Sequence, residues 1–319
     1  MNMAAERHGT PVAAWTLLGV ALVAVSSAGA VLQGMDQVPP LLRASWRMQG
    51  TALVLLPGFL YQVRAIERPT IDNYQWAIVA ASSIFLAIHF GSWVWSLDNT
   101  SLVHSLLFVN THPLVLVTLM PLMGRSIRRG HVLGVSIGFA GAAIALFDLG
   151  DGGEVSAAGD AAAFLGAATV VGYLLAGRYL RSVRGMPIFV YAFPVTLGAG
   201  VWLSISAFVI EGASLSSMVP ESSLLGWTDL SWLAWVAYLS LGPGLCGHTG
   251  INTVLKWISP IIVSIVLLLE PVLGGLIGWL LTDEALLGMY TFIGGVLMIG
   301  GAILVTLEEN NELSDESVS

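Results

Sequence analysis

Cysteine and charge are both scarce in this chain. Cys246 is the single cysteine among 319 residues, which excludes an internal disulfide framework and a cysteine-rich metal site. Charged residues make up 10% of the sequence, against about 25% in an ordinary soluble domain. Hydrophobic residues make up 56%, more apolar surface than a soluble core of this length absorbs. The scarcity of charge therefore indicates a chain that is solvated by lipid.

Motifs of catalysis and nucleic-acid recognition are absent as well. The sequence has no phosphate-binding P-loop, no His-Glu-x-x-His zinc helix and no nucleophile elbow. It also has no basic patch of the kind that binds nucleic acid. We therefore expect no catalytic residue, no metal, no cofactor and no nucleic-acid partner.

Long apolar runs fill the sequence instead. A transmembrane helix needs about 20 mostly apolar residues, and ten runs approach or reach this length. They cover residues 12–32, 39–60, 75–97, 101–123, 131–147, 158–179, 187–210, 230–253, 260–281 and 286–307. The small residues at 28–30 resemble a signal-peptide cleavage site, but the first run is long enough to span and we expect it to be retained.

Basic residues are as unevenly placed as they are few. With the N-terminus in the cytoplasm, ten of the twelve Lys and Arg residues fall on the cytoplasmic side, and the other two, Arg43 and Arg47, lie inside the second run. The outer loops carry acidic residues and no Lys or Arg. This distribution obeys the positive-inside rule and would be scrambled by a miscount of one helix. We expect a multi-pass protein of the cell membrane with both termini in the cytoplasm.

The chain repeats itself weakly. When Pro113 is aligned with Pro271, Ser101 falls on Ser259, and the Gly-rich helices that follow come into near register. Each half has five runs, an odd number, so the second half enters the membrane from the opposite side. The predicted fold is an all-α integral membrane protein of ten transmembrane helices in two inverted five-helix repeats.

This fold prediction divides the chain into four parts. Residues 1–11 are a cytosolic N-terminus, 12–149 the first repeat and 158–307 the second. Residues 308–319 are an acidic cytosolic tail, which we expect to be solvated and disordered.

Several segments resemble one known family. They are LLLEPVLGGLIGWLL at 267–281 with the acidic pair that follows, GDAAAFLGAATVVGYLLAGRYL at 159–180, and LLRASWR at 41–47. Along nearly its whole length the chain looks like a member of the EamA family of the drug/metabolite transporter superfamily. The resemblance implies a transporter fold with ten helices and leaves the substrate open, because the family carries amino acids, metabolites, purines and xenobiotics. The chain departs from the family pattern at His248 and Asn252, where an aromatic pair is common.

Glu270 is the sharpest functional signal. A charged side chain at a helix centre costs roughly 2.5–3.5 kcal/mol, so Glu270 must face a cavity or a partner. There it suits proton coupling or a cationic substrate, or it is a structural residue of the fold. Its counterpart in the repeat is His112, and the two residues form a candidate proton relay. Asn110 and Thr111 would line the same region with neutral hydrogen-bonding groups.

Arg43 and Arg47 lie one turn apart on one face of the second predicted helix. A guanidinium suits capture of a carboxylate or phosphate. The alternative for Arg43 is a side chain that reaches to the outer surface, and the alternative for Arg47 is a structural ion pair. His89, His248 and Trp93 are further cavity candidates, and each has packing or a place in the interfacial aromatic belt as its alternative.

These features together predict a secondary transporter that moves small metabolites by alternating access, with proton coupling as an option. Its expected partners are a small-molecule substrate, membrane lipids and, if coupling holds, protons. Two alternatives stay open: an intramembrane enzyme that uses His and Glu, and a membrane scaffold or receptor that does not transport.

Overall fold

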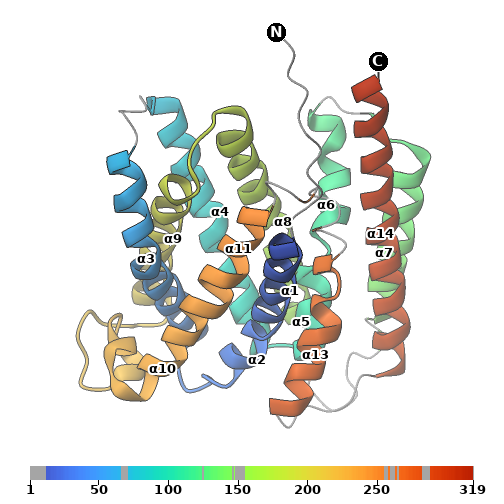
Figure 1. Cartoon of the computed structure of the whole chain (residues 1–319). Helices are drawn as coiled ribbons and strands as arrows, with labels where there is room; N and C mark the ends of the chain where they lie inside the picture. The colour runs from blue at the N-terminus through green and yellow to red at the C-terminus, as the bar shows by residue number, and fades with distance from the viewer. Residues whose placement is uncertain are drawn as a thin grey trace.

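The computed structural model describes residues 12–65, 71–123, 126–145, 147, 155–254, 258, 263, 266–281 and 288–318. These residues form a bundle of helices (Figure 1). The one strand-like pairing among them is an isolated bridge between Ser214 and Ser223. The predicted cytosolic segment 1–11 and the predicted start of the ninth span at residue 260 lie outside the described residues.

The described residues of the first half form seven α-helices. They are α1 (Val12–Ser26), α2 (Ala28–Gln33), α3 (Pro40–Ala65), α4 (Asn73–Leu97), α5 (Leu102–Val109), α6 (His112–Leu119) and α7 (Arg129–Ala145).

Besides the short π-helical η3 (Tyr179–Val183), the described residues of the second half form six α-helices and a longer π-helical segment. They are α8 (Ala157–Arg178), α9 (Ile188–Ile210), α10 (Leu230–Leu239), the π-helical η6 (Ser240–Thr249), α11 (Gly250–Val254), α13 (Glu270–Leu281) and α14 (Met289–Val318).

Helix starts follow local side-chain chemistry. At the start of α4, Asp72 Oδ1 accepts from the Gln75 backbone N–H at 2.7 Å, and Gln75 Oε1 accepts from the Asp72 N–H at 3.0 Å. This capping box satisfies two of the donors that a helix N-terminus leaves open. Ser156 caps α8 in a similar way, through a hydrogen bond from Gly159 N–H.

Seven helical stretches of the described residues are long and apolar enough to cross a membrane. They are Val12–Gln33, Asn73–Leu97, Leu102–Leu119, Ala157–Arg181, Ile188–Ile210, Leu230–Val254 and Met289–Glu308. Two further apolar helices, α7 and α13, are shorter, and α3 has 26 residues but includes three arginines. The chain is thus an all-helical, multi-pass membrane protein, and the count of ten spans stays a prediction.

Corresponding helices of the two halves pack against each other in opposite directions. Gly200 of α9 lies beside Met48 of α3, whereas Phe189, earlier in α9, lies beside Gly58, later in α3. In the same way, the fourth and ninth predicted spans pack antiparallel: Leu106 and Leu102 of α5 contact Gly274 and Gly278 of α13, respectively. Antiparallel pairing of equivalent helices is the arrangement that an inverted repeat predicts.

The last helices of the two halves, α7 and α14, approach most closely. A Cβ atom added at Gly301 would lie 2.4 Å from the Gly134 carbonyl oxygen, and one added at Gly141 would lie 2.6 Å from the Gly294 oxygen. Only glycine permits this backbone contact. Small residues therefore join the two halves along this edge, as they do in many membrane helix pairs.

The acidic tail differs from expectation. We predicted disorder after residue 307, but α14 continues as helix to Val318. A helix that leaves the membrane satisfies its own backbone hydrogen bonds, and Glu and Leu in this segment are good helix formers. Residues 308–318 therefore continue α14.

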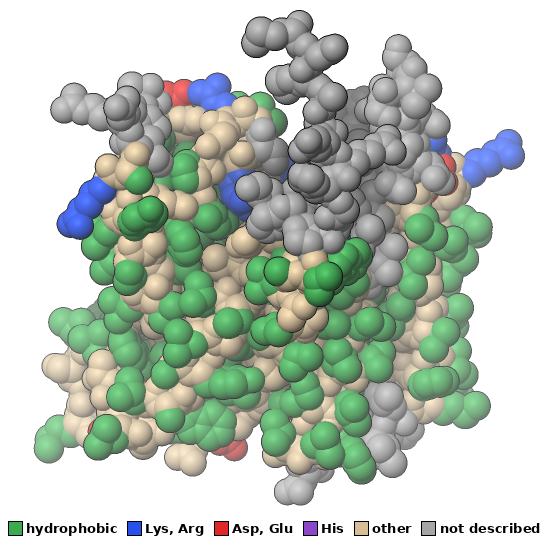
Figure 2. Space-filling model, in the orientation of Figure 1, with side chains coloured by type: hydrophobic (Ala, Val, Ile, Leu, Met, Phe, Trp, Pro, Cys, Tyr) green, Lys and Arg blue, Asp and Glu red, His purple; other side chains and the backbone are tan. Residues whose placement is uncertain are grey.

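The surface shows a polar end and an apolar waist. In Figure 2, basic side chains gather at the upper end of the molecule, where α14 ends, and hydrophobic side chains are spread over the face below them. The basic residues at the helix ends include Arg64 of α3, Arg129 of α7 and Arg178 of α8. The sequence prediction assigns this end to the cytoplasm.

Candidate functional site

A central cavity of about 110 Å³ lies between the two halves. Seven of the nine residues that the sequence nominated line it: Arg47, His89, Trp93, Asn110, His112, His248 and Glu270. The wall is completed by Val25, Ala28, Phe90, Val109, Val170, Tyr173, Leu174, Ile251, Asn252 and Leu267. Helices of both halves therefore contribute polar and aromatic side chains to one cavity.

Broken helices place two of these polar groups. Helix α5 ends at Val109 and α6 begins at His112, so Asn110 sits at the break. The equivalent helix of the second half, α13, begins at Glu270, directly before Pro271. Discontinuous helices with their ends at a cavity are typical of binding sites in secondary transporters.

Glu270 has a defined neighbour in the cavity. Its carboxylate lies within hydrogen-bonding reach of the Asn110 side chain and interacts electrostatically with Arg47. Asn110 in turn donates to the Leu106 carbonyl oxygen at 2.9 Å. The two helix breaks thus meet across the boundary between the halves.

Arg47 is the most unusual residue of the site. It is 1% exposed, and its guanidinium carbon lies 4.4 Å from the centre of the Phe90 ring and 5.6 Å from that of Trp93. Its Nε and Nη1 atoms have no hydrogen-bond partner among the described residues, and neither does Nε1 of Trp93. A buried cation with open donors is costly, so the aromatic rings stabilise Arg47 only in part.

The three histidines occupy different places in the wall. His89 Nδ1 lies 2.9 Å from the Gly166 carbonyl oxygen, and its ring stacks on Trp93 at 6.3 Å. His248 meets the Phe90 ring edge-on at 5.7 Å. His112 lies within hydrogen-bonding reach of the Val109 carbonyl oxygen, which Pro113 leaves without its helical donor.

The predicted pair of Glu270 and His112 is brought into one cavity, but each residue has its own partner. Glu270 interacts with Asn110, and His112 with the backbone of Val109. Each side chain lies at its own helix break and bonds to a partner there. A direct relay between the two therefore stays a prediction.

Two nominated residues lie outside the cavity wall. Thr111 is buried and donates to the Phe108 carbonyl oxygen at 2.6 Å, which caps the end of α5. Arg43 is fully buried, donates to the Leu32 carbonyl oxygen at 2.6 Å and forms an ion pair with Asp98. The expectation that Arg43 reaches the outer surface is therefore wrong: Asp98 neutralises its charge inside the protein.

Sequence reasoning missed several members of the site. Phe90 supports Arg47, and Tyr173 continues the wall into a smaller pocket that Arg47, His248 and Asn252 also line. Arg181 Nη1 donates to the Asn252 carbonyl oxygen at 3.0 Å. An aromatic residue beside a histidine in an apolar run was the only available signal for Phe90, and it is a weak one.

On the Asp98 side of the cavity, α3 is joined to the long 211–229 segment of the second half. Trp46 Nε1 donates to the Ser223 carbonyl oxygen at 3.0 Å, and Trp227 Nε1 donates to Gln49 Oε1 at 2.7 Å. The Glu211 carboxylate accepts from the first backbone N–H groups of α3, at 2.7 and 2.9 Å. These contacts close the end of the molecule that the sequence places outside.

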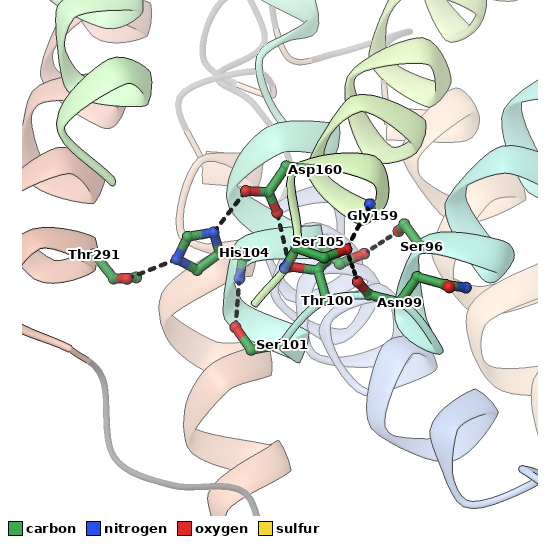
Figure 3. A network of polar contacts seen from close by, with 10 residues as sticks. Ser96, Asn99, Thr100, Ser101, His104, Ser105, Gly159, Asp160 and Thr291 are labelled. Carbon is green, nitrogen blue, oxygen red and sulfur yellow. Dashed lines mark hydrogen bonds and ion pairs between the residues drawn. The ribbon is translucent and has the colours of Figure 1, made fainter. Parts of the chain in front are cut away.

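A second buried polar network lies near the same end and was not anticipated. Figure 3 shows His104 between Asp160 and Thr291: its Nδ1 is 3.0 Å from Asp160 Oδ2, and its Nε2 is 2.7 Å from Thr291 Oγ1. Thr100 donates to the other Asp160 oxygen at 2.8 Å. The network ties α5 of the first half to α8 and α14 of the second, with its polar atoms paired.

A membrane-spanning bundle of two helical repeats around a polar cavity defines the class of multi-pass transport proteins. The family model of the EamA-like transporter family matches twice, at residues 11–147 and 157–307. The chain belongs to this family, and it is accordingly a membrane transporter of the drug/metabolite transporter superfamily. Members of the family are transporters, not enzymes.

The remaining comparisons concern fold. No curated protein matches the sequence. Nineteen solved chains match the structure. One of them, titled "Crystal structure of protein", superposes with a TM-score of 0.61 at 18% sequence identity, over 94% of this chain and 98% of that chain. At this identity the likeness shows the fold alone.

Proposed function

We propose that the protein is a secondary transporter of small metabolites that works by alternating access, with the central cavity as its cargo site. One observation carries the proposal: both halves line the cavity, and they bury Arg47 and Glu270 in it. Buried ionisable groups at membrane depth are expensive and mark substrate or ion pathways.

Each half has its own part in this proposal. Arg47 of α3 and Trp93 of α4 offer hydrogen-bond donors to cargo, and Glu270 of α13 offers a carboxylate that can take up or release a proton. The breaks at Asn110 and Glu270 give the backbone a place to bend as the halves rock about the site. Proton coupling through Glu270 is part of the proposal.

Alternating access is testable without knowing the cargo. In a Cys246→Ser background, Val109→Cys places one thiol in the cavity wall. An impermeant maleimide should label it from either side of sealed vesicles, because the site opens to each side in turn. Labelling from one side only, or from neither, in a protein that melts like the parent would contradict alternating access.

The same background fixes the orientation. Met218 is fully exposed in the 211–229 segment, and Arg128 precedes α7 at the other end of the bundle. We propose that both termini are cytoplasmic in a cell-membrane protein. Met218→Cys should then react from outside in intact cells, and Arg128→Cys only after permeabilisation. The reverse pattern would invert the topology.

A further inference from the structure

We infer that the cavity binds an organic monoanion, a carboxylate on a flat apolar body, through Arg47 and Trp93, together with a proton on Glu270. This inference rests on the carrier proposal and names the substrate class of the same site. It starts from hydrogen-bond groups that the fold leaves open.

The open groups are all donors. Among the described residues that line the cavity, the buried polar atoms without a partner are Nε and Nη1 of Arg47 and Nε1 of Trp93. Each is an N–H group and none can accept. A ligand that completes this wall must bring acceptors, and next to a guanidinium the strongest acceptor is an oxyanion.

The open donors lie close together. Arg47 lies 4.4 Å above the Phe90 ring, and the Phe90 and Trp93 ring centres are 6.0 Å apart. Because Phe90 holds the guanidinium from below, the planar head of Arg47 is preorganised for two-pronged binding. A carboxylate is planar and has two oxygens, which matches this arrangement.

Part of the remaining wall is apolar. Val109, Tyr173, Leu174 and Ile251 line the cavity beside the two aromatic rings. Ring faces and aliphatic side chains favour a planar hydrocarbon body over a hydrated sugar or phosphate.

Charge balance in the cavity explains why a proton on Glu270 accompanies the anion. The other ionisable groups that line the cavity with Glu270 are Arg47 of α3, His89 of α4, His112 of α6, Tyr173 of α8 and His248 of η6. With the histidines and Tyr173 neutral, Arg47 and ionised Glu270 cancel. An added anion would leave one uncompensated negative charge in a buried site, and a proton on Glu270 removes it.

Four probes that share a phenyl ring test the assignment: benzoate (anion), benzamide (neutral), benzylamine (cation) and phenylglycine (zwitterion). We would measure their effect on the melting temperature and their Kd for the purified full chain. Benzoate should stabilise the protein, more strongly at lower pH above its own pKa, and the other three should bind at least tenfold more weakly.

Variants locate the binding. Arg47→Met should abolish the benzoate effect and Arg47→Lys should weaken it about tenfold, because lysine keeps the charge but not the planar fork. Glu270→Gln, a permanently uncharged mimic, should still bind benzoate, with less dependence on pH. Ser206→Ala is the matched control, since Ser206 bonds only within α9, to the Trp202 carbonyl oxygen. If Arg47→Met fails to fold, the test rests on the expected tenfold weakening of benzoate binding in Arg47→Lys.

Several outcomes would overturn the assignment. These are equal binding of benzamide, tighter binding of phenylglycine or benzylamine, loss of benzoate binding in Glu270→Gln, or no binding by any probe. None of them touches the carrier proposal, which the two-sided labelling of Val109→Cys tests independently. Two-sided labelling with benzamide or benzylamine bound would keep the carrier and reject the anion.

Discussion

Arg43 and Arg47 lie one turn apart on α3, and both are buried. Arg43 donates to the Leu32 carbonyl oxygen and pairs with Asp98, so its charge is neutralised and both terminal nitrogens are bonded, with only Nε left without a partner. Arg47 lies over Phe90, and its Nε and Nη1 have no partner. A buried charge that the protein satisfies holds the fold together, and one that it leaves open is available to a ligand.

The same contrast holds beyond α3. The network of His104, Asp160 and Thr291 is buried and paired, and it joins the two halves (Figure 3). Polar groups around the cavity are also buried, yet the wall there includes open donors. The paired groups at the His104 end of the bundle therefore hold the two halves together, whereas the open donors of the cavity are free to bind a ligand.

The largest expected effect on stability comes from removing Arg43, the arginine whose charge is paired. Arg43→Met leaves Asp98 and the Leu32 carbonyl oxygen without their donor, and should lower the free energy of unfolding by about 3 kcal/mol. Denaturant unfolding in detergent measures it against the wild type. An unchanged midpoint would show that the Arg43–Asp98 pair contributes no stability and would break the comparison.

Asp160→Asn probes the second satisfied region. The amide keeps the shape but removes the charge that His104 and Thr100 face, and one of its atoms must be a donor where an acceptor is needed. We expect a loss of about 2 kcal/mol in the same unfolding measurement. His104→Ala in the Asp160→Asn background should cost less than in the wild type, because the network is already broken, whereas full additivity would argue against a coupled network.

Arg47→Met tests the other arginine of the comparison, whose donors are open. It removes a desolvated cation with open donors and keeps an apolar side chain over Phe90, so the free energy of unfolding without ligand should change by less than about 1 kcal/mol, in either direction. A loss as large as that of Arg43→Met would mean that Arg47 is structural after all.

Glu211 gives the smallest effect, and it depends on pH. Burial raises the pKa of this carboxyl, while the α3 backbone N–H groups and Arg43 oppose the rise. A raised folded pKa means that folding favours the protonated form, so the stability that Glu211 contributes is fully present below its unfolded pKa and lost as pH rises through the folded pKa.

The measurement compares melting temperatures of the wild type and Glu211→Gln between pH 7 and pH 4. As pH falls, the wild type should gain stability relative to the variant, which has no carboxyl to titrate. A relative loss by the wild type over this range would mean that the hydrogen bonds to α3 outweigh burial.

Much of the site follows from local sequence, and part of it does not. Intramembrane charge next to proline marked Glu270, and the weak repeat marked His112 and Asn110 beside it; all three line the cavity. Thr111, one residue from Asn110, points its hydroxyl back to Phe108 instead. A helix break turns neighbouring side chains in different directions, which spacing alone does not reveal.

Composition and pattern by themselves determined that this chain crosses the membrane repeatedly as helices in two related halves. Lipid leaves the backbone no other partners, so apolar length and the placement of arginine are strong signals. Tertiary structure alone decided which of two arginines one turn apart has its charge paired. The partners of Arg43 and the rings beneath Arg47 come from α2, α4 and the turn after α4, and only packing brings Asp98 to one and Phe90 to the other.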